Sequence, residues 1–351
     1  MIITGIVLQA VRVLGLAMLS FVVAMIVTPF VLRLIEKYGI KKQIRDASEA
    51  PIFAKLHAGK AGTPTMGGVI VWATVLGIAL VLWGLASLFD GFWSYLNFVD
   101  RAQTYLPLFA MVLAALVGLL DDYFGTRRIG PRGGGLTMRH RLLMYSALAI
   151  VGALWFYFKL DWTTLAIPFV GSVTVGWWYI PIFVLVIVSS AFSANETDGL
   201  DGLAGGVMLF AYVALTVVAF VLGRFDLATM SSVVAGALLA FLWFNIYPAR
   251  FFMGDTGSMS MGITIGVIAM LTNTTLLLPL FVPIFVIESG SVIMQLLSKK
   301  FRGKKIFLST PLHHHFEALG WHETKVTMRF WIVSIMAVTM GLVIFFLNRF
   351  L

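Results

Sequence analysis

The chain contains no cysteine, and only 12% of its 351 residues are charged. The lack of cysteine excludes disulfides, iron–sulfur clusters and thiolate chemistry. A soluble domain has about a quarter charged residues, whereas this chain is 60% hydrophobic. The composition therefore predicts an all-α polytopic membrane protein. The first ten residues contain no lysine or arginine, so we expect no cleaved signal peptide, which would begin with a basic segment.

Ten stretches are apolar enough to be candidate spanning helices, which need about 20 residues each. They are residues 11–35, 66–88, 105–120, 142–158, 179–192, 203–222, 229–247, 258–271, 276–297 and 330–347. Residues 161–176 are rich in Thr, Val and Phe with Pro and Gly breaks, which favours a small extracytoplasmic β-hairpin. Because no repeat of fixed period is present, we expect residues 1–351 to form a single integral membrane domain.

Basic residues fall mainly on one side of these predicted helices. We number the loops between the ten predicted helices one to nine along the chain. Of the 25 lysines and arginines, 20 lie in the odd-numbered loops or, as Arg33, at the end of the first helix. The positive-inside rule therefore places the odd loops in the cytoplasm and both termini outside. The net charge of +9 then reflects topology and anionic partners, and we expect no nucleic acid to bind.

Polar clusters interrupt the apolar chain in the same odd loops. They contain Lys60 in loop one, Asp121 and Asp122 in loop three, Asn195, Asp198 and Asp201 in loop five, Asp255 in loop seven, and His313, His314 and His315 in loop nine. Five loops that are distant in sequence thus contribute to one face, which is typical of a single site between packed helices.

Asp121 and Asp122 follow the apolar residues 105–120, which span about 24 Å as a helix. The hydrocarbon core is about 30 Å thick, so both acids should lie slightly below the inner headgroups. They are poor helix ends, because carboxylates at a helix C-terminus oppose the dipole. We predict that they line a functional, water-filled cleft. The alternative is that they are ordinary interfacial acids.

The other aspartates also have structural alternatives. Asp198 or Asp201 could cap the helix that follows them, and Asp255 could cap the next one. Nearby, Asn245 and Phe252 offer amide and aromatic groups suited to a nucleotide base, although Phe252 could equally anchor the chain in the membrane interface.

The three adjacent histidines are not spaced for zinc. Side chains of neighbouring residues in an extended loop point in alternating directions, and the H-E-x-x-H pattern of zinc hydrolases is absent. We expect His313, His314 and His315 to bind phosphate or transfer protons. Glu288 lies within an apolar helix and is a candidate either for function or for pairing inside the bundle.

Several acids gathered at one face would repel an anionic substrate unless a cation compensates them. Carboxylate oxygens without cysteine suit Mg²⁺ or Mn²⁺, which complete their coordination with substrate phosphates and water. Acids, a metal and nearby bases at a membrane surface predict phosphoryl transfer that involves a lipid.

Five motifs carry a family resemblance: GTPTMGG, LLDDYFG, TDGLDGL, FMGDTGS and PLHHHFE. In order and spacing they resemble the phospho-N-acetylmuramoyl-pentapeptide transferases, a branch of the polyprenyl-phosphate N-acetylhexosamine-1-phosphate transferases. The resemblance runs from about Gly39 to the C-terminus. It implies ten helices, a homodimer, the bacterial cytoplasmic (inner) membrane and a cytoplasmic active site. It also implies transfer of phospho-MurNAc-pentapeptide from UDP-MurNAc-pentapeptide to undecaprenyl phosphate, giving lipid I and UMP with Mg²⁺.

The resemblance also implies roles for individual residues. Asp255 resembles the metal ligand, and Asp121 and Asp122 resemble the catalytic pair, with Asp121 activating the lipid phosphate. The remaining correspondences are His314 in the catalytic set, His313 and His315 at the diphosphate or sugar, and Lys60, Thr65, Asn195, Asp198, Asp201, Asn245 and Phe252 at the substrate, mostly on its uridine side. The chain departs from the family pattern N-x-x-N-x-x-D-G, because Phe192 occupies the first asparagine position and Glu196 replaces an apolar residue.

Three other functions differ from this one in what they require. A GlcNAc-1-phosphate transferase of the same superfamily would use UDP-GlcNAc, but GTPTMGG and the histidine motif favour the muramoyl branch. An ion-coupled transporter would place its acids near the midplane of two related halves, whereas here the acids cluster at one face and no halves repeat. A non-catalytic scaffold would tolerate Asp255→Asn.

Overall fold

The computed structural model describes residues 2–41, 60, 62–100, 103–130 and 134–350. Within these ranges, eight helices are long and apolar enough to cross a membrane. They are α1 (Ile2–Lys37), α3 (Val69–Leu88), α5 (Tyr105–Thr126), α6 (Met138–Lys159), α7 (Tyr179–Thr197), α8 (Leu203–Val221), α9 (Phe225–Asn245) and α14 (Glu323–Phe350). The predicted all-α membrane architecture is confirmed. Among the basic residues counted for topology, Lys42, Arg45, Lys55, Arg101 and Arg132 lie outside the described residues.

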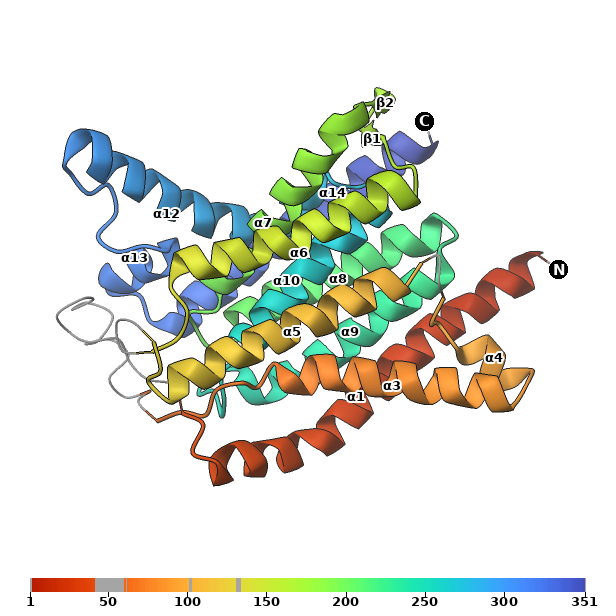
Figure 1. Cartoon of the computed structure of the whole chain (residues 1–351), viewed down its shortest axis with the longest axis horizontal. Helices are drawn as coiled ribbons and strands as arrows, with labels where there is room; N and C mark the ends of the chain where they lie inside the picture. The colour runs from red at the N-terminus through yellow and green to blue at the C-terminus, as the bar shows by residue number, and fades with distance from the viewer. Residues whose placement is uncertain (1, 42–59, 61, 101–102, 131–133, 351) are drawn as a thin grey trace.

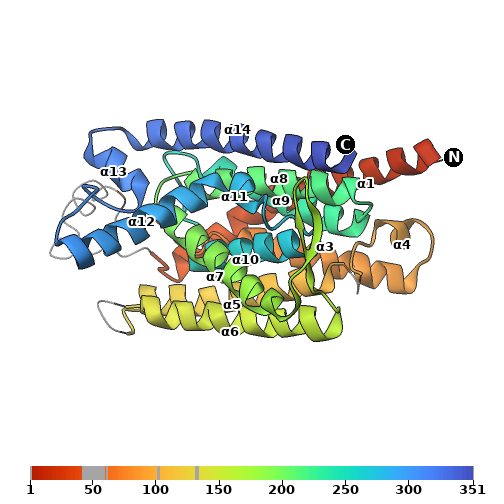
Figure 2. The same ribbon diagram turned by 90° about the horizontal axis from the view of Figure 1, so that it is seen from above.

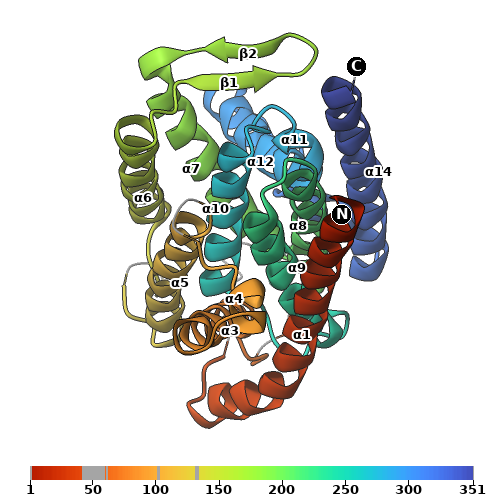
Figure 3. The same ribbon diagram turned by 90° about the vertical axis from the view of Figure 1, so that its right-hand side faces the viewer.

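The two remaining predicted spans are also helical but differ from the others. α10 (Asp255–Leu271) has 17 residues, and Figures 2 and 3 show it in the middle of the bundle. The stretch 276–297 is not one helix, because it divides into α11 (Leu278–Phe281) and α12 (Pro283–Arg302). The prediction of a single helix there is wrong. Pro283 lacks an N–H group and fixes its own φ, so it begins a helix and does not continue one.

The central helix α10 is buried at every residue after Asp255. Small residues allow this close packing, because they let helix backbones approach one another. A Cβ atom at Gly262 would lie 2.6 Å from Ala194 Cβ on α7, and one at Gly118 on α5 would lie 2.4 Å from the carbonyl oxygen of Asp255. The start of α10 is therefore held directly against α5.

The predicted β-hairpin is confirmed. Its strands β1 (Thr164–Ile167) and β2 (Gly171–Thr174) pair antiparallel, with Leu165 opposite Val173. Figure 1 shows this hairpin and both chain termini at one end of the bundle, while the short helix α13 (Leu312–Ala318) lies at the other end. Two further short elements, α4 (Phe92–Leu96) and η3 (Gly176–Trp178), belong to connections between the long helices.

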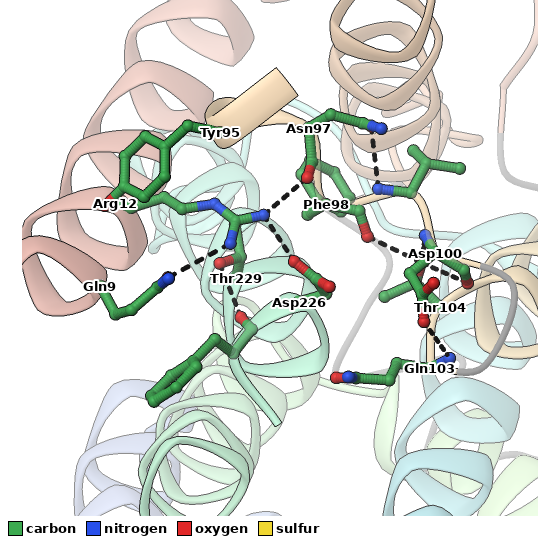
Figure 4. Close-up of polar contacts among 12 residues, drawn as sticks. Gln9, Arg12, Tyr95, Asn97, Phe98, Asp100, Gln103, Thr104, Asp226 and Thr229 are labelled. Atoms are coloured by element: carbon green, nitrogen blue, oxygen red, sulfur yellow. Dashed lines mark hydrogen bonds and ion pairs between the residues drawn. The ribbon is translucent and has the colours of Figure 1, made fainter. Parts of the chain in front are cut away.

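A buried arginine fastens the first helix near its N-terminus (Figure 4). Arg12 on α1 forms an ion pair with Asp226 on α9 at 2.6 Å and donates to the carbonyl oxygen of Asn97 at 2.7 Å. Its guanidinium also lies 5.5 Å from the ring centroid of Tyr95. Arg12 is one of the few basic residues outside the odd loops, and it joins α1, α9 and the connection between α4 and α5.

Candidate active site

The two aspartates of the LLDDYFG motif lie in the last turns of α5 but face different partners. Asp121 is buried. Its Oδ1 atom accepts a hydrogen bond from the backbone N–H of Leu136 at 2.6 Å, and its Oδ2 atom lies 2.6 Å from Arg141 Nε. Asp121 therefore connects the end of α5 to the start of α6.

Asp122 holds the first turn of α10. Its Oδ1 and Oδ2 atoms accept hydrogen bonds from the backbone N–H groups of Asp255 at 3.0 Å and Thr256 at 2.9 Å. The N-cap position of α10 is Gly254, which has no side chain to satisfy these groups. Asp122 thus caps α10 from another helix, and the alternative that Asp255 caps this helix is wrong.

The Asp255 side chain is directed to a different cluster. Its Oδ1 atom accepts from Asn195 Nδ2 at 2.5 Å, and its Oδ2 atom lies 2.7 Å from Arg141 Nη2. Arg141 also donates from Nη1 to Asn195 Oδ1 at 3.1 Å. One guanidinium therefore joins Asp121, Asp255 and Asn195, which come from α5, α10 and α7.

Arg141 was not among the predicted site residues, because it appeared to be one more basic residue of loop three. A signal was present, since Arg141 lies near the start of α6, where the positive end of the helix dipole disfavours a cation. An arginine placed there needs compensating acids, as the structure shows.

Oxygen atoms of the cluster match the ligands that Mg²⁺ prefers. Asp121 Oδ2, Asp255 Oδ2 and Asn195 Oδ1 all converge on the Arg141 guanidinium. Among the described residues, no group of three or more His, Cys, Asp or Glu side chains could hold a metal ion. The donor set fits a cation that binds through few carboxylates and completes its coordination with phosphates and water.

A second charged cluster surrounds Lys60. Its Nζ atom lies 2.6 Å from Asp201 Oδ1, forms an ion pair with Glu323, and lies 5.8 Å from the ring centroid of Phe252. Burial lowers the pKa of Lys60, but hydrogen bonds and charge attraction from Asp201 and Glu323 raise it above its ordinary value. The ammonium group therefore stays charged. Glu323 was not predicted, because an acid in the first turn of a helix is a common dipole partner.

The aspartates of the TDGLDGL motif do not cap the following helix. Gly202 occupies the N-cap of α8, so the capping alternative is wrong for both acids. Asp201 Oδ2 accepts from the backbone N–H of Ala249 at 2.9 Å, and Asp198 Oδ2 accepts from that of Gly254 at 3.2 Å. Both carboxylates therefore join loop five to loop seven.

Asn245 continues this connection. Its Oδ1 atom accepts from Gly202 N at 3.1 Å, and its Nδ2 atom donates to the carbonyl oxygen of Phe251 at 2.8 Å. The GTPTMGG motif, in which Thr65 is buried, runs alongside. There the N–H of Phe252 donates to the carbonyl oxygen of Pro64 at 2.9 Å. Loops one, five and seven are thus joined by backbone and amide hydrogen bonds.

The three histidines of α13 have separate partners. His313 Nδ1 lies 3.1 Å from Glu288 Oε1, His314 Nδ1 lies 2.7 Å from Glu317 Oε2, and His315 Nδ1 accepts from the N–H of Leu308 at 3.2 Å. A Cβ atom at Gly199 would lie 2.1 Å from His313 Nε2, so the His313 ring lies against the TDGLDGL loop. His315 instead contacts the connection that precedes α13.

Comparisons with known proteins place the chain among related sequences. A glycosyl transferase family 4 model matches residues 105–273, and a phospho-N-acetylmuramoyl-pentapeptide-transferase signature matches residues 60–70. Similar proteins carry the name phospho-N-acetylmuramoyl-pentapeptide-transferase, and three of them serve as examples. The protein from Chloroflexus aurantiacus is 36% identical over 94% of this chain and 89% of its own. The proteins from Anoxybacillus flavithermus and Clostridium perfringens are 35% and 38% identical, over 93% and 90% of this chain and 95% and 93% of their own.

Proposed function

Because the chain belongs to the phospho-N-acetylmuramoyl-pentapeptide transferase family, we propose that it transfers phospho-MurNAc-pentapeptide from its UDP carrier to undecaprenyl phosphate. The products are lipid I and UMP. The observation that carries the proposal is the convergence of Asp121, Asp255 and Asn195 on the Arg141 guanidinium. Such a cluster offers both oxygen ligands for a cation and a planar donor for phosphate oxygens.

In the proposed reaction, Asp255 would hold Mg²⁺, which would supply positive charge to compensate the negative charge of the diphosphate. Asp121 accepts the proton of the lipid phosphate, whose oxygen attacks the β-phosphorus as the bond to UMP breaks. Asp122 keeps Asp255 in place through its two hydrogen bonds to the start of α10. Arg141 contacts the diphosphate. The alternative is a two-step path in which an aspartate first forms an aspartyl-phosphate. That path predicts a phospho-enzyme that can be isolated and that then reacts to give lipid I.

The nucleotide is assigned to the Lys60 cluster. The ring of Phe252 offers a face on which uracil can stack. Asp198, Asp201 and Asn245 lie in or beside the loops that meet there. The charged Lys60 and its partner Asp201 lie beside that ring. The histidines of α13 are assigned to the diphosphate and sugar, because His313 contacts the adjacent glycine loop.

We further propose that the molecule is a single-domain homodimer with its site in the cytoplasm and both termini outside. The basic residues support this orientation, because most of them belong to the odd-numbered loops of the sequence. The position of both termini at the opposite end is consistent with it (Figure 1).

The test is UMP release by detergent-purified protein supplied with undecaprenyl phosphate and UDP-MurNAc-pentapeptide. Release should need Mg²⁺, stop with EDTA, and fall at least about a hundredfold in Asp255→Asn. Asp161→Asn is the matched control. It makes the same change in an exposed residue beside the β-hairpin, at the end away from the site, and should release UMP at the wild-type rate. Release from UDP-GlcNAc with none from the muramoyl substrate would instead establish the GlcNAc-1-phosphate activity.

A further inference from the structure

The helix α12 carries a buried polar face. Glu288, Ser291, Gln295 and Ser298 are all buried and recur at intervals of three and four residues, so they share one side of the helix. The opposite side exposes large apolar residues, which include Val286 at 51%, Ile293 at 51% and Leu297 at 49%. The inward polar side faces the segment that returns from α12 and carries the histidines.

Two residues of this polar face, Gln295 and Ser298, form hydrogen bonds with backbone groups of the segment that follows α12. Gln295 Nε2 donates to the carbonyl oxygen of Phe307 at 2.9 Å, and its Oε1 atom accepts from the N–H of Ile306 at 2.9 Å. Ser298 Oγ donates to the carbonyl oxygen of Lys304 at 2.8 Å. These contacts are neutral and fix the path of the returning chain.

Glu288 differs from these neighbours because it is an acid and reaches a histidine side chain. Its Oε1 atom lies 3.1 Å from His313 Nδ1. The backbone N–H of His313 also points at the carboxylate, 3.3 Å from Oε1 and 3.4 Å from Oε2. Both residues are fully buried. A buried carboxylate is costly unless it is paired and hydrogen-bonded, and His313 supplies both kinds of partner.

On its other sides, the His313 ring contacts the glycine loop and a second histidine, His314, which is assigned to the substrate. Its Nε2 atom lies against Gly199, and its ring centroid lies 4.0 Å from that of His314. His314 in turn pairs with Glu317 at 2.7 Å. A displacement of the His313 ring would therefore reach both the glycine loop and the second histidine.

We propose that Glu288 is a positioning residue for the transfer reaction, which orients the His313 ring against Gly199 and thereby holds His314 at the substrate. This inference rests on the proposed function of the same site. The groups that face His313 are Glu288 from α12, Glu196 from α7, and Glu317 and His314 from α13.

The charge balance around His313 gives the proposal a pH signature. Burial lowers the pKa of His313, but the charge attraction and hydrogen bond of Glu288, together with the attraction of Glu317 and Glu196, raise it above its ordinary value. His313 therefore keeps its proton to higher pH than a histidine buried without these carboxylates. Without the Glu288 charge, burial dominates and the pKa of His313 falls.

The experiment compares Glu288→Gln, Glu288→Asp and Gln295→Ala in UMP release across pH, with thermal stability measured for each. In Glu288→Gln, kcat should fall at least about tenfold at neutral pH, while KM should stay within threefold. In a plot of kcat against pH, the alkaline limb, where kcat falls as pH rises, should move to lower pH. Glu288→Asp should keep the wild-type limb, because it keeps the charge. Gln295→Ala removes a neutral contact from the same face of α12, so it should lower stability without moving the limb.

A measurement independent of substrate accompanies the assay. In protein labelled with ¹⁵N-histidine, the His313 resonance, identified by its loss in His313→Gln, should titrate at lower pH in Glu288→Gln than in wild type. An unchanged titration, or an equal shift of the limb in Gln295→Ala, would overturn the inference. If wild type releases no UMP while the His313 titration still shifts, the proposed function fails and the coupling of Glu288 to His313 stands.

Discussion

Replacing Asp122 with asparagine should loosen the first turn of α10, a helix to which Asp122 does not belong. Both carboxylate oxygens accept backbone N–H groups there, from Asp255 at 3.0 Å and from Thr256 at 2.9 Å. An asparagine has one acceptor oxygen, so one of these N–H groups would face an NH₂ group and lose its partner.

The magnitude follows from these two contacts. A buried donor left unpaired costs about 1–3 kcal/mol. Loss of the negative charge at a partly buried helix N-terminus costs up to about 2 kcal/mol more. A combined loss of about 3 kcal/mol corresponds to roughly a hundredfold, because each 1.4 kcal/mol is a factor of about ten. Local opening of this turn should therefore become roughly a hundredfold more frequent.

Hydrogen–deuterium exchange followed by mass spectrometry measures that opening in detergent or lipid nanodiscs. Peptides that cover the start of α10 should exchange faster in Asp122→Asn. The neighbouring substitution Asp121→Asn is the matched control. Asp121 accepts from Leu136 with one oxygen and pairs with Arg141 through the other. Asparagine removes the charge that pairs with Arg141, so Asp121→Asn should accelerate exchange around residues 134–140 and leave α10 protected. Equal exchange at α10 in wild type and Asp122→Asn would refute the capping role.

Two further substitutions test the site. Arg141→Gln leaves Asp121 and Asp255 without their shared cation and should lower kcat for UMP release about a hundredfold or more. Arg139→Gln changes an exposed residue on the same helix, and its kcat should stay within twofold of wild type. Equal losses in the two variants would contradict the bridging role. Gly199→Ala places a methyl group 2.1 Å from His313 Nε2 and should reduce kcat at least about tenfold. Gly290→Ala, whose Cβ would meet no atom within 4 Å, should keep wild-type kcat and raise thermal stability, since alanine favours helix by about 1 kcal/mol. A Gly199→Ala enzyme with wild-type kcat would show that the ring position is unimportant.

The long helices could be predicted because membrane-spanning stretches are long, apolar and separated by polar loops. The break at Pro283 was visible as a proline, but apolar residues continue across it, and hydropathy alone therefore predicts one helix. The hairpin of β1 and β2 followed from its turn residues. The internal position of α10 was not predictable in the same way, because its burial depends on glycines that contact other helices.

The site was predictable as a set of residue types more than as a set of contacts. The motifs identified Asp121, Asp122 and Asp255 without showing that one of them caps the helix on which another lies. Such a cap depends on the approach of α5 to α10, which sequence spacing does not encode. Arg141 was missed because its charge agreed with the topology of its loop and thus needed no further explanation.

The contact between Arg12 and Asp226 has a consequence for biogenesis. The two residues are 214 positions apart in the chain, and helices enter a membrane in the order of their synthesis. Until α9 is synthesised, the Arg12 guanidinium on α1 lacks the carboxylate of Asp226. An uncompensated charge at the centre of a bilayer costs about 2.5–3.5 kcal/mol. The first helix to be inserted therefore acquires its permanent place late, and a ribosome stalled before α9 holds a bundle whose first helix is not yet fastened.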